Sequence, residues 1–117
     1  MEAETAMSKK RIAGAVSHHA REVAELRGNR RLAVEYLKAA MESLDDPEDR
    51  GAGLLALRTI VEAFGGMAVV ADEAGISREA LYRSLSPSGN PTLKTLIAVL
   101  SAVGMKLSIE KGERLAA

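Results

Sequence analysis

Arginine, tyrosine and small polar side chains are concentrated between residues 77 and 94, where they could recognise a polyanion. Arginine can donate two hydrogen bonds to a guanine edge or hold a phosphate, and tyrosine can reach a phosphate or a thymine methyl group. The pattern predicts a surface for duplex DNA, and the simpler alternative is an ordinary solvated helix face. The candidate contacts are Ser77, Arg78, Glu79, Tyr82, Arg83, Ser86, Ser88, Asn90 and Lys94.

Two short helices joined by a sharp turn are expected to position these side chains. Residues 65–85 read GGMAVVADEAGISREALYRSL, and their apolar spacing predicts a helix that ends at Gly75 in the left-handed conformation. Ser77 is a natural N-cap for a second helix, and Glu79 suits the positive end of its dipole. The stretch therefore has the length and turn of a helix-turn-helix. The residues expected to face the core are Met67, Val70, Ala71, Ala74, Ile76, Ala80, Leu81 and Leu85.

A third helix and a strand are predicted to follow. Asn90 and Pro91 supply an N-cap and a first-turn proline, and Gly104 ends the helix. One face of this helix is expected to bury Leu93, Leu96, Ile97, Leu100 and Val103. Beyond it, Met105, Leu107 and Ile109 alternate with Lys106, Ser108 and Glu110, which is the period of a half-buried strand. Such a strand would pair with its counterpart in a second subunit or cap the helical core.

Upstream of residue 65 the chain also reads as helical. Ala33, Leu37, Ala40, Met41 and Leu44 form one apolar stripe, and a second helix with Leu54, Leu57, Val61 and Phe64 on one side ends at Gly65 and Gly66. Asp46 and Pro47 predict the start of that second helix. The first thirty residues hint at an amphipathic helix through Ile12, Val16, Val23 and Leu26. We therefore expect three regions: 1–30 partly flexible or helical, 31–64 helical, and 65–117 with the helix-turn-helix and strand.

The run from Gly65 to Ile109, with LYRSLSPSGNPTLKTL as its most specific part, resembles the addiction-module antidote proteins of the HigA-like group. These are Cro/XRE-type helix-turn-helix antitoxins. The resemblance implies an all-α, lambda-repressor-like helix-turn-helix bundle with a short C-terminal strand, which binds its own operator as a homodimer. Related proteins often carry a glutamine early in the first motif helix to clamp a phosphate, where this chain has Val69. Either that anchor comes from another residue or DNA binding is weaker here.

The resemblance also implies a protein partner, a basic toxin of the RelE/ParE superfamily that the antitoxin neutralises. Residues 31–64 contain four basic and seven acidic residues, a balance of minus three, although the whole chain is neutral. Complementary charge would steer and orient a basic partner. The alternative is that these acids only solubilise the chain and the apolar stripes are internal core. The candidate toxin contacts are Glu35, Tyr36, Met41, Glu42, Asp45, Asp46 and Asp49.

Composition limits the remaining classes. The chain is 47% apolar and 3% aromatic, which suits one unit of closely packed short helices. Cysteine is absent, so neither disulfides nor thiolate metal sites are possible. No long apolar run predicts a signal peptide or a membrane span, and the expected location is the cytoplasm. The sequence pI of about 6.7 counts against strong DNA binding, although the acidic residues are concentrated in region 31–64.

Enzyme interpretations lack support in the sequence. Gly51 and Gly53 imitate a dinucleotide fingerprint, but they follow an acidic helix start instead of a strand. His18 and His19 point about 100° apart on a helix, and Glu22 is the one plausible companion ligand. We therefore expect no catalysis, cofactor or metal. Two other functions remain open: a solitary XRE-type regulator, and a protein-interaction module that no longer binds DNA.

Overall fold

The computed structural model describes residues 18–112. Residues 18–28 are helical, so the predicted Val23 and Leu26 lie on a helix, whereas Ile12 and Val16 fall outside the described residues. Five further helices follow in the order α2 (Arg30–Ser43), α3 (Arg50–Ala63), α4 (Met67–Ala74), α5 (Arg78–Ser84) and α6 (Leu93–Ala102). The described part of the chain contains helices and connecting segments, with no strand. The expected all-α class agrees with this arrangement.

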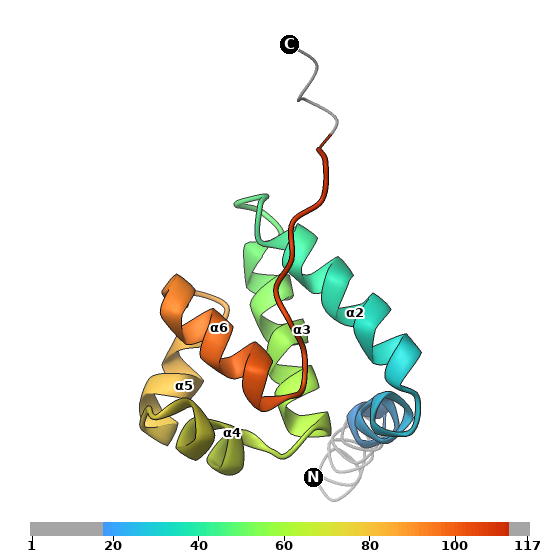
Figure 1. The fold of residues 1–117 in the computed structure, drawn as a ribbon, viewed down its shortest axis with the longest axis vertical. Helices are drawn as coiled ribbons and strands as arrows, with labels where there is room; N and C mark the ends of the chain where they lie inside the picture. Colours follow the sequence, from blue (N-terminus) through green and yellow to red (C-terminus); the bar gives the residue numbers. More distant parts are fainter. Residues whose placement is uncertain (1–17, 113–117) are drawn as a thin grey trace, which may run out of the picture.

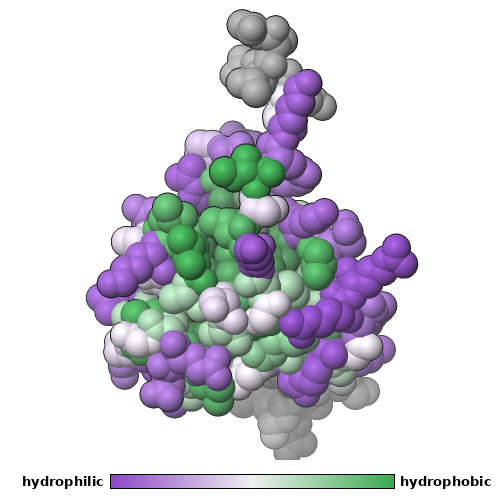
Figure 2. All heavy atoms as spheres, in the orientation of Figure 1, coloured by the Kyte–Doolittle hydropathy of each residue, from purple (hydrophilic) through white to green (hydrophobic). Residues whose placement is uncertain are grey.

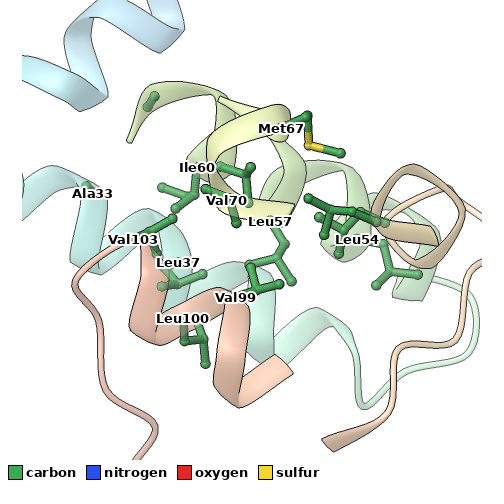
Figure 3. Close-up of a cluster of buried hydrophobic side chains, with 14 of the residues drawn as sticks. Ala33, Leu37, Leu54, Leu57, Ile60, Met67, Val70, Val99, Leu100 and Val103 are labelled. Carbon is green, nitrogen blue, oxygen red and sulfur yellow. The ribbon is translucent and has the colours of Figure 1, made fainter. Parts of the chain in front are cut away.

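One hydrophobic cluster joins all of these helices. Helix α3 runs through the middle, with α2 antiparallel to it on one side and α4, α5 and α6 on the other (Figure 1). Leu57 and Ile60 of α3 are fully buried between Leu37 of α2 and Val99 of α6, and Val70 of α4 closes the same cluster (Figure 3). Burial of side chains of this size contributes about 1.5–3 kcal/mol each. The apolar stripes predicted for the upstream helices are confirmed at Ala33, Leu37, Ala40, Leu54, Leu57 and Val61.

The turn between α4 and α5 forms as the local sequence predicts. Gly75 has a φ of 72°, in the left-handed region that costs most other residues free energy, and its N–H donates to the last turn of α4. The side-chain oxygen of Ser77 accepts a hydrogen bond from the Ala80 N–H at 3.1 Å, so Ser77 is the N-cap of α5. Leu81 and Leu85 are fully buried. The opposite face of α5 is therefore free to meet solvent.

Two helices begin later than predicted. Helix α3 begins at Arg50, because Asp46 Oδ1 accepts from the Glu48 N–H at 2.9 Å and stabilises a turn before the helix. Helix α6 begins at Leu93, and its N-cap is Thr92, whose hydroxyl accepts from the Thr95 N–H at 3.1 Å. The prediction that Asn90 caps α6 was therefore wrong. A capping side chain closer to the helix took that role.

The buried face of α6 is narrower than predicted. Leu100 and Val103 are buried and Leu96 is half-buried, but Leu93 and Ile97 are 63% and 49% exposed. Helix α4 packs against α6, and Leu93 and Ile97 stay largely outside this contact. The exposure of Leu93 and Ile97 corrects the prediction that they belong to the core.

The predicted C-terminal strand does not form within the described chain. Residues 105–112 leave α6 as an extended segment that passes in front of α3 and then away from the helices (Figure 1). A strand needs a neighbouring strand for its backbone hydrogen bonds, and residues 18–112 supply none.

None of the described helices is individually long and apolar enough to span a membrane. Helices α3 and α4 would reach that length and composition only as a pair, and they are bent by 96° at the break between them.

Candidate nucleic-acid interface and acidic surface

The solvent face of α5 presents two guanidinium groups and one carboxylate. Arg78, Glu79 and Arg83 are all exposed, and Ser77 lies at the N-terminus of the same helix. The Ser77 oxygen is used as a helix cap, but its hydroxyl hydrogen can still donate to a ligand. Arg78 and Arg83 point about 140° apart around the helix with Glu79 between them, so the exposed face of α5 carries a net positive charge. Such a face can contact phosphates or base edges.

Tyr82 lies between this face and the core. It is half-buried and packs against the hydrophobic cluster. The guanidinium carbon of Arg58, on α3, lies 4.7 Å from the centroid of the Tyr82 ring. This is a cation–π distance, and the contact also fixes the ring in one orientation. Tyr82 is therefore partly accessible, and Arg58 covers one face of its ring.

Arg58 is a residue that reading the sequence did not single out. Its side chain is about one third exposed, and its Nε lies 3.5 Å from Glu62 Oε1, one turn further along α3. Glu62 in turn lies 2.6 Å from His19 Nε2. These contacts hold Arg58 beside α5 with part of its guanidinium facing solvent. No local pattern could have linked it to Tyr82, because the two residues lie on different helices.

The loop between α5 and α6 folds back on the end of α5. Ser86 Oγ donates to the Arg83 carbonyl oxygen at 2.8 Å, so its hydroxyl hydrogen is used within the chain. The Gly89 N–H donates to the Ser86 carbonyl oxygen at 2.8 Å. The remaining candidates of this region, Ser88, Asn90 and Lys94, are exposed. The structure thus leaves most of the predicted contacts accessible and gives Ser86 an internal role.

Val69 lies on the exposed side of α4 and is 51% exposed. It offers no hydrogen bond at the position where the resemblance predicts a phosphate clamp. Neighbouring Met67, at the first position of α4, is buried. The exposed side of α4 therefore carries Ala68 and Val69 in its first half and the carboxylates Asp72 and Glu73 in its second half.

The acidic candidates of the upstream half face solvent. Glu35 and Glu42 are exposed on α2, and Asp45, Asp46 and Asp49 are exposed in the turn that follows it. We call the last three the loop acids. Their carboxylates lie in one turn of six residues between α2 and α3, although Asp46 also accepts the hydrogen bond from Glu48. The result is a compact negative surface at the end of the α2–α3 pair.

The two apolar candidates in this half are already in contact with the core. Tyr36 and Met41 are half-buried against the hydrophobic cluster. The Tyr36 hydroxyl donates to Glu22 Oε1 at 2.8 Å. Burial of the phenol, together with this nearby carboxylate, raises the pKa of Tyr36 above its usual value of 10.0. Tyr36 thus ties α2 to the helix over residues 18–28.

The histidine and acidic residues do not assemble into a metal site within the described residues, where no group of three or more suitable side chains lies together. His19 contacts Glu62, and Glu22 accepts the hydrogen bond from Tyr36.

Comparison with known proteins assigns the chain to a family. Residues 7–111 match the family described as probable addiction module antidote proteins. A protein of Haemophilus influenzae, described as uncharacterized, is 42% identical over 45 residues, which cover 38% of this chain and 46% of that protein. The match thus spans less than half the length of that relative. No solved structure matches the chain. Since the family match extends over most of its residues, the chain belongs to the family of probable addiction module antidote proteins.

Proposed function

We propose that this chain is an antitoxin that binds its own operator as a dimer through α4 and α5, which act as a helix-turn-helix of the Cro/XRE type, and so represses its operon. The observation that carries the proposal is the exposed pair Arg78 and Arg83 on a helix whose start is set by Gly75 and Ser77. In helix-turn-helix proteins, the second helix enters the major groove and the first crosses the backbone. Helix α5 has the short length and cationic face for the first of these roles.

Arg58 is the proposed phosphate anchor in place of the glutamine that Val69 replaces. Its guanidinium is partly exposed and is held by the Tyr82 ring and by Glu62. Arginine matches phosphate geometry with paired donors, and a guanidinium held in place loses less conformational entropy on binding. Tyr82 would then orient Arg58 and contact the DNA backbone through its own hydroxyl group.

DNA binding is tested by mobility-shift titration against the promoter region of the chain's own operon. Arg78→Ala and Arg83→Ala should each weaken binding by about tenfold or more, because each removes a bidentate contact worth about 1–3 kcal/mol. Arg31→Ala is the matched control, because Arg31 is an exposed arginine on α2. Equal affinities for all three variants and the wild type would contradict the proposed interface.

The proposed protein partner is a basic toxin of the RelE/ParE superfamily, which binds to the acidic surface of α2 and the loop acids. Support comes from membership of the antidote family and from the exposure of Glu35, Glu42 and the loop acids. Complementary charges raise the association rate and fix the orientation of two proteins. Met41, half-buried beside Glu42, would add an apolar contact within this polar surface.

A pull-down with the protein encoded by the adjacent gene tests this surface. Reversal of all three loop acids to lysine should slow association by about tenfold or more and make it less sensitive to salt. The control carries the same three reversals at exposed acids elsewhere, namely Glu25, Asp72 and Glu73. Unchanged toxin capture by the loop-acid variant would exclude this surface.

One alternative has an observation in its favour. The exposed Val69 and the neutral net charge suit a protein-interaction module that no longer binds DNA. The mobility-shift titration separates the two functions, because true operator binding weakens steeply with added salt. Membership of the antidote family favours a toxin partner over a solitary regulator.

A further inference from the structure

The C-terminal segment of residues 105–111 combines a strand sequence with an unpaired backbone. Met105 is half-buried against the core, Leu107 is 40% exposed and Ile109 is 97% exposed. Within the described part of the chain, no backbone group from residue 106 to 112 hydrogen-bonds to another backbone group. An extended segment with alternating apolar side chains and free backbone donors and acceptors is a template for pairing with another strand.

The surface beside this segment is hollow and is lined by both apolar and polar side chains. A groove of about 540 Å³ lies between α2 and the segment, and Leu37, Met41, Leu100 and Leu107 are among its lining residues. Leu93 and Ile97 continue the stripe of Leu100 along α6 and are exposed. Hydrophobic side chains gather on this face of the molecule within a hydrophilic surround (Figure 2). A strand added here would therefore cover the apolar part of this surface, and such packing is what a two-stranded ribbon needs for stability.

We propose that residues 105–111 pair antiparallel with the same residues of a second copy of this chain, about a two-fold axis at Ser108. The inference rests on the proposed function only for the assumption that the antitoxin works as a dimer. The segment would form a two-stranded ribbon shared by the protomers. Because the two strands are identical, the interface is isologous and closes at two subunits.

The charges and apolar residues of the segment select this register. Pairing about Ser108 places Lys106 opposite Glu110 and Leu107 opposite Ile109, and the two-fold axis repeats both pairs. Opposite charges and apolar pairs directly across a ladder are both stabilising. A shift of the axis to Leu107 would set Lys106 against Ser108 and leave Glu110 opposite Gly104. An axis between two residues would oppose apolar to polar side chains.

The partner's Ile109 would lie beside Leu107, which lines the groove. Ile109 would bury the most apolar surface on pairing, since it is almost fully exposed in the single chain. On the same face of the ribbon, Met105 would meet the aliphatic stem of Lys111, and the other face would carry Lys106, Ser108 and Glu110. The pairing covers Ile109 and gives partners to the backbone groups on the edge that faces the second strand.

Cysteine cross-linking tests the register directly, because the chain has no cysteine of its own. Ser108→Cys places the two sulfur-bearing residues opposite each other at the two-fold axis. Directly opposed residues in an antiparallel pair have Cα atoms about 4.5–5.5 Å apart, within the range that a disulfide spans. Mild oxidation of the full-length variant should therefore give a covalent dimer as the main product on non-reducing electrophoresis.

Two further cysteine variants are the matched controls. Lys106→Cys alone should not cross-link, because its two copies would lie four residues apart along the ribbon, about 13 Å. Glu110→Cys alone should behave in the same way. A mixture of the two variants should cross-link, because position 106 of one chain faces position 110 of the other.

Charge reversal gives an independent measurement in solution. Lys106→Glu and Glu110→Lys should each weaken dimerisation by about tenfold in sedimentation equilibrium, because each creates two like-charge pairs. The double variant should return to within about threefold of the wild type. Lys111→Glu, in the same segment but opposite Met105, should have little effect.

A monomeric wild type would overturn the proposal, as would a dimer in which Ser108→Cys fails to cross-link or Lys106→Cys cross-links alone. The same holds if Ile109→Asp abolishes toxin capture and leaves the dimer intact, because the segment would then be a toxin-binding strand. Cross-linking is measured without toxin or DNA. A failure to cross-link would therefore contradict only the proposed pairing of the segment. A wild type that fails to bind its operator or to capture toxin would instead contradict the proposed function.

Discussion

Replacing Arg83 with glutamine should lower the salt dependence of operator binding by a defined amount. Glutamine keeps a polar side chain of similar reach, so α5 should remain folded and only the positive charge is lost. Arg83 is exposed on α5, and its side chain makes no contact that the core depends on. A change in salt dependence would therefore report on phosphate contacts and not on the fold.

The expected magnitude follows from the number of cations on the proposed face. Arg78, Arg83 and Lys94 are exposed and Arg58 is partly so, which makes four per protomer and eight per dimer. With about 0.9 counterions released per phosphate neutralised, the slope of log K against log salt should be about −7. Arg83→Gln removes two charges per dimer, so its slope should be about −5. Between about 50 and 200 mM salt, the wild type should lose about ten thousandfold in affinity and the variant about a thousandfold.

Fluorescence anisotropy with a labelled promoter fragment, measured at several salt concentrations, gives both slopes. Arg31→Gln on α2 removes the same charge away from the proposed face and should keep the wild-type slope. Two results would refute the reasoning. One is a slope near zero for the wild type, and the other is a slope that responds to Arg31→Gln and not to Arg83→Gln.

Three further predictions concern the fold. The folded-state pKa of Tyr36 is raised above 10.0, so its contribution to the free energy of unfolding is complete below about pH 10 and is lost as the pH rises above that value. Tyr36→Phe should therefore flatten the decline of the free energy of unfolding, measured by urea unfolding between pH 9 and 11. Gly89→Ala should destabilise the chain by about 2 kcal/mol or more in the same assay, because the new Cβ would clash with the Ser84 carbonyl oxygen. Gly28→Ala is the control, because a Cβ there has open space, and it should be neutral or slightly stabilising. Leu57→Ala at the fully buried centre of α3 should cost about 2–5 kcal/mol, and a loss under 1 kcal/mol by calorimetry would mean that the core is packed differently.

Local sequence was sufficient where a feature depends on neighbouring residues. Gly75 and Ser77 determine the α4–α5 turn through a left-handed φ and a side-chain cap, and both act within four residues. The apolar stripes of α2 and α3 are likewise visible from helical spacing. The helix starts were less predictable, because several polar residues competed as caps and Thr92 prevailed over Asn90.

Gly53 illustrates what spacing alone could not explain. In the sequence it weakens a helix and imitates part of a nucleotide-binding fingerprint. In the structure a Cβ at this position would lie 2.7 Å from the Ala40 carbonyl oxygen, so the glycine permits the close approach of α2 and α3. Its role depends on a residue of another helix.

By itself, the sequence determined the helical class, the Gly75 turn and the cationic face of α5, because each follows from backbone preference and from side-chain periodicity within a single helix. Only the tertiary structure decided that Arg58 stacks on Tyr82, that Leu93 and Ile97 stay exposed, and that the strand sequence after Gly104 finds no partner in the described chain. These outcomes depend on which surfaces meet when helices distant in the sequence pack together. Whether two side chains fit together where such helices touch is determined by the packing of the whole fold.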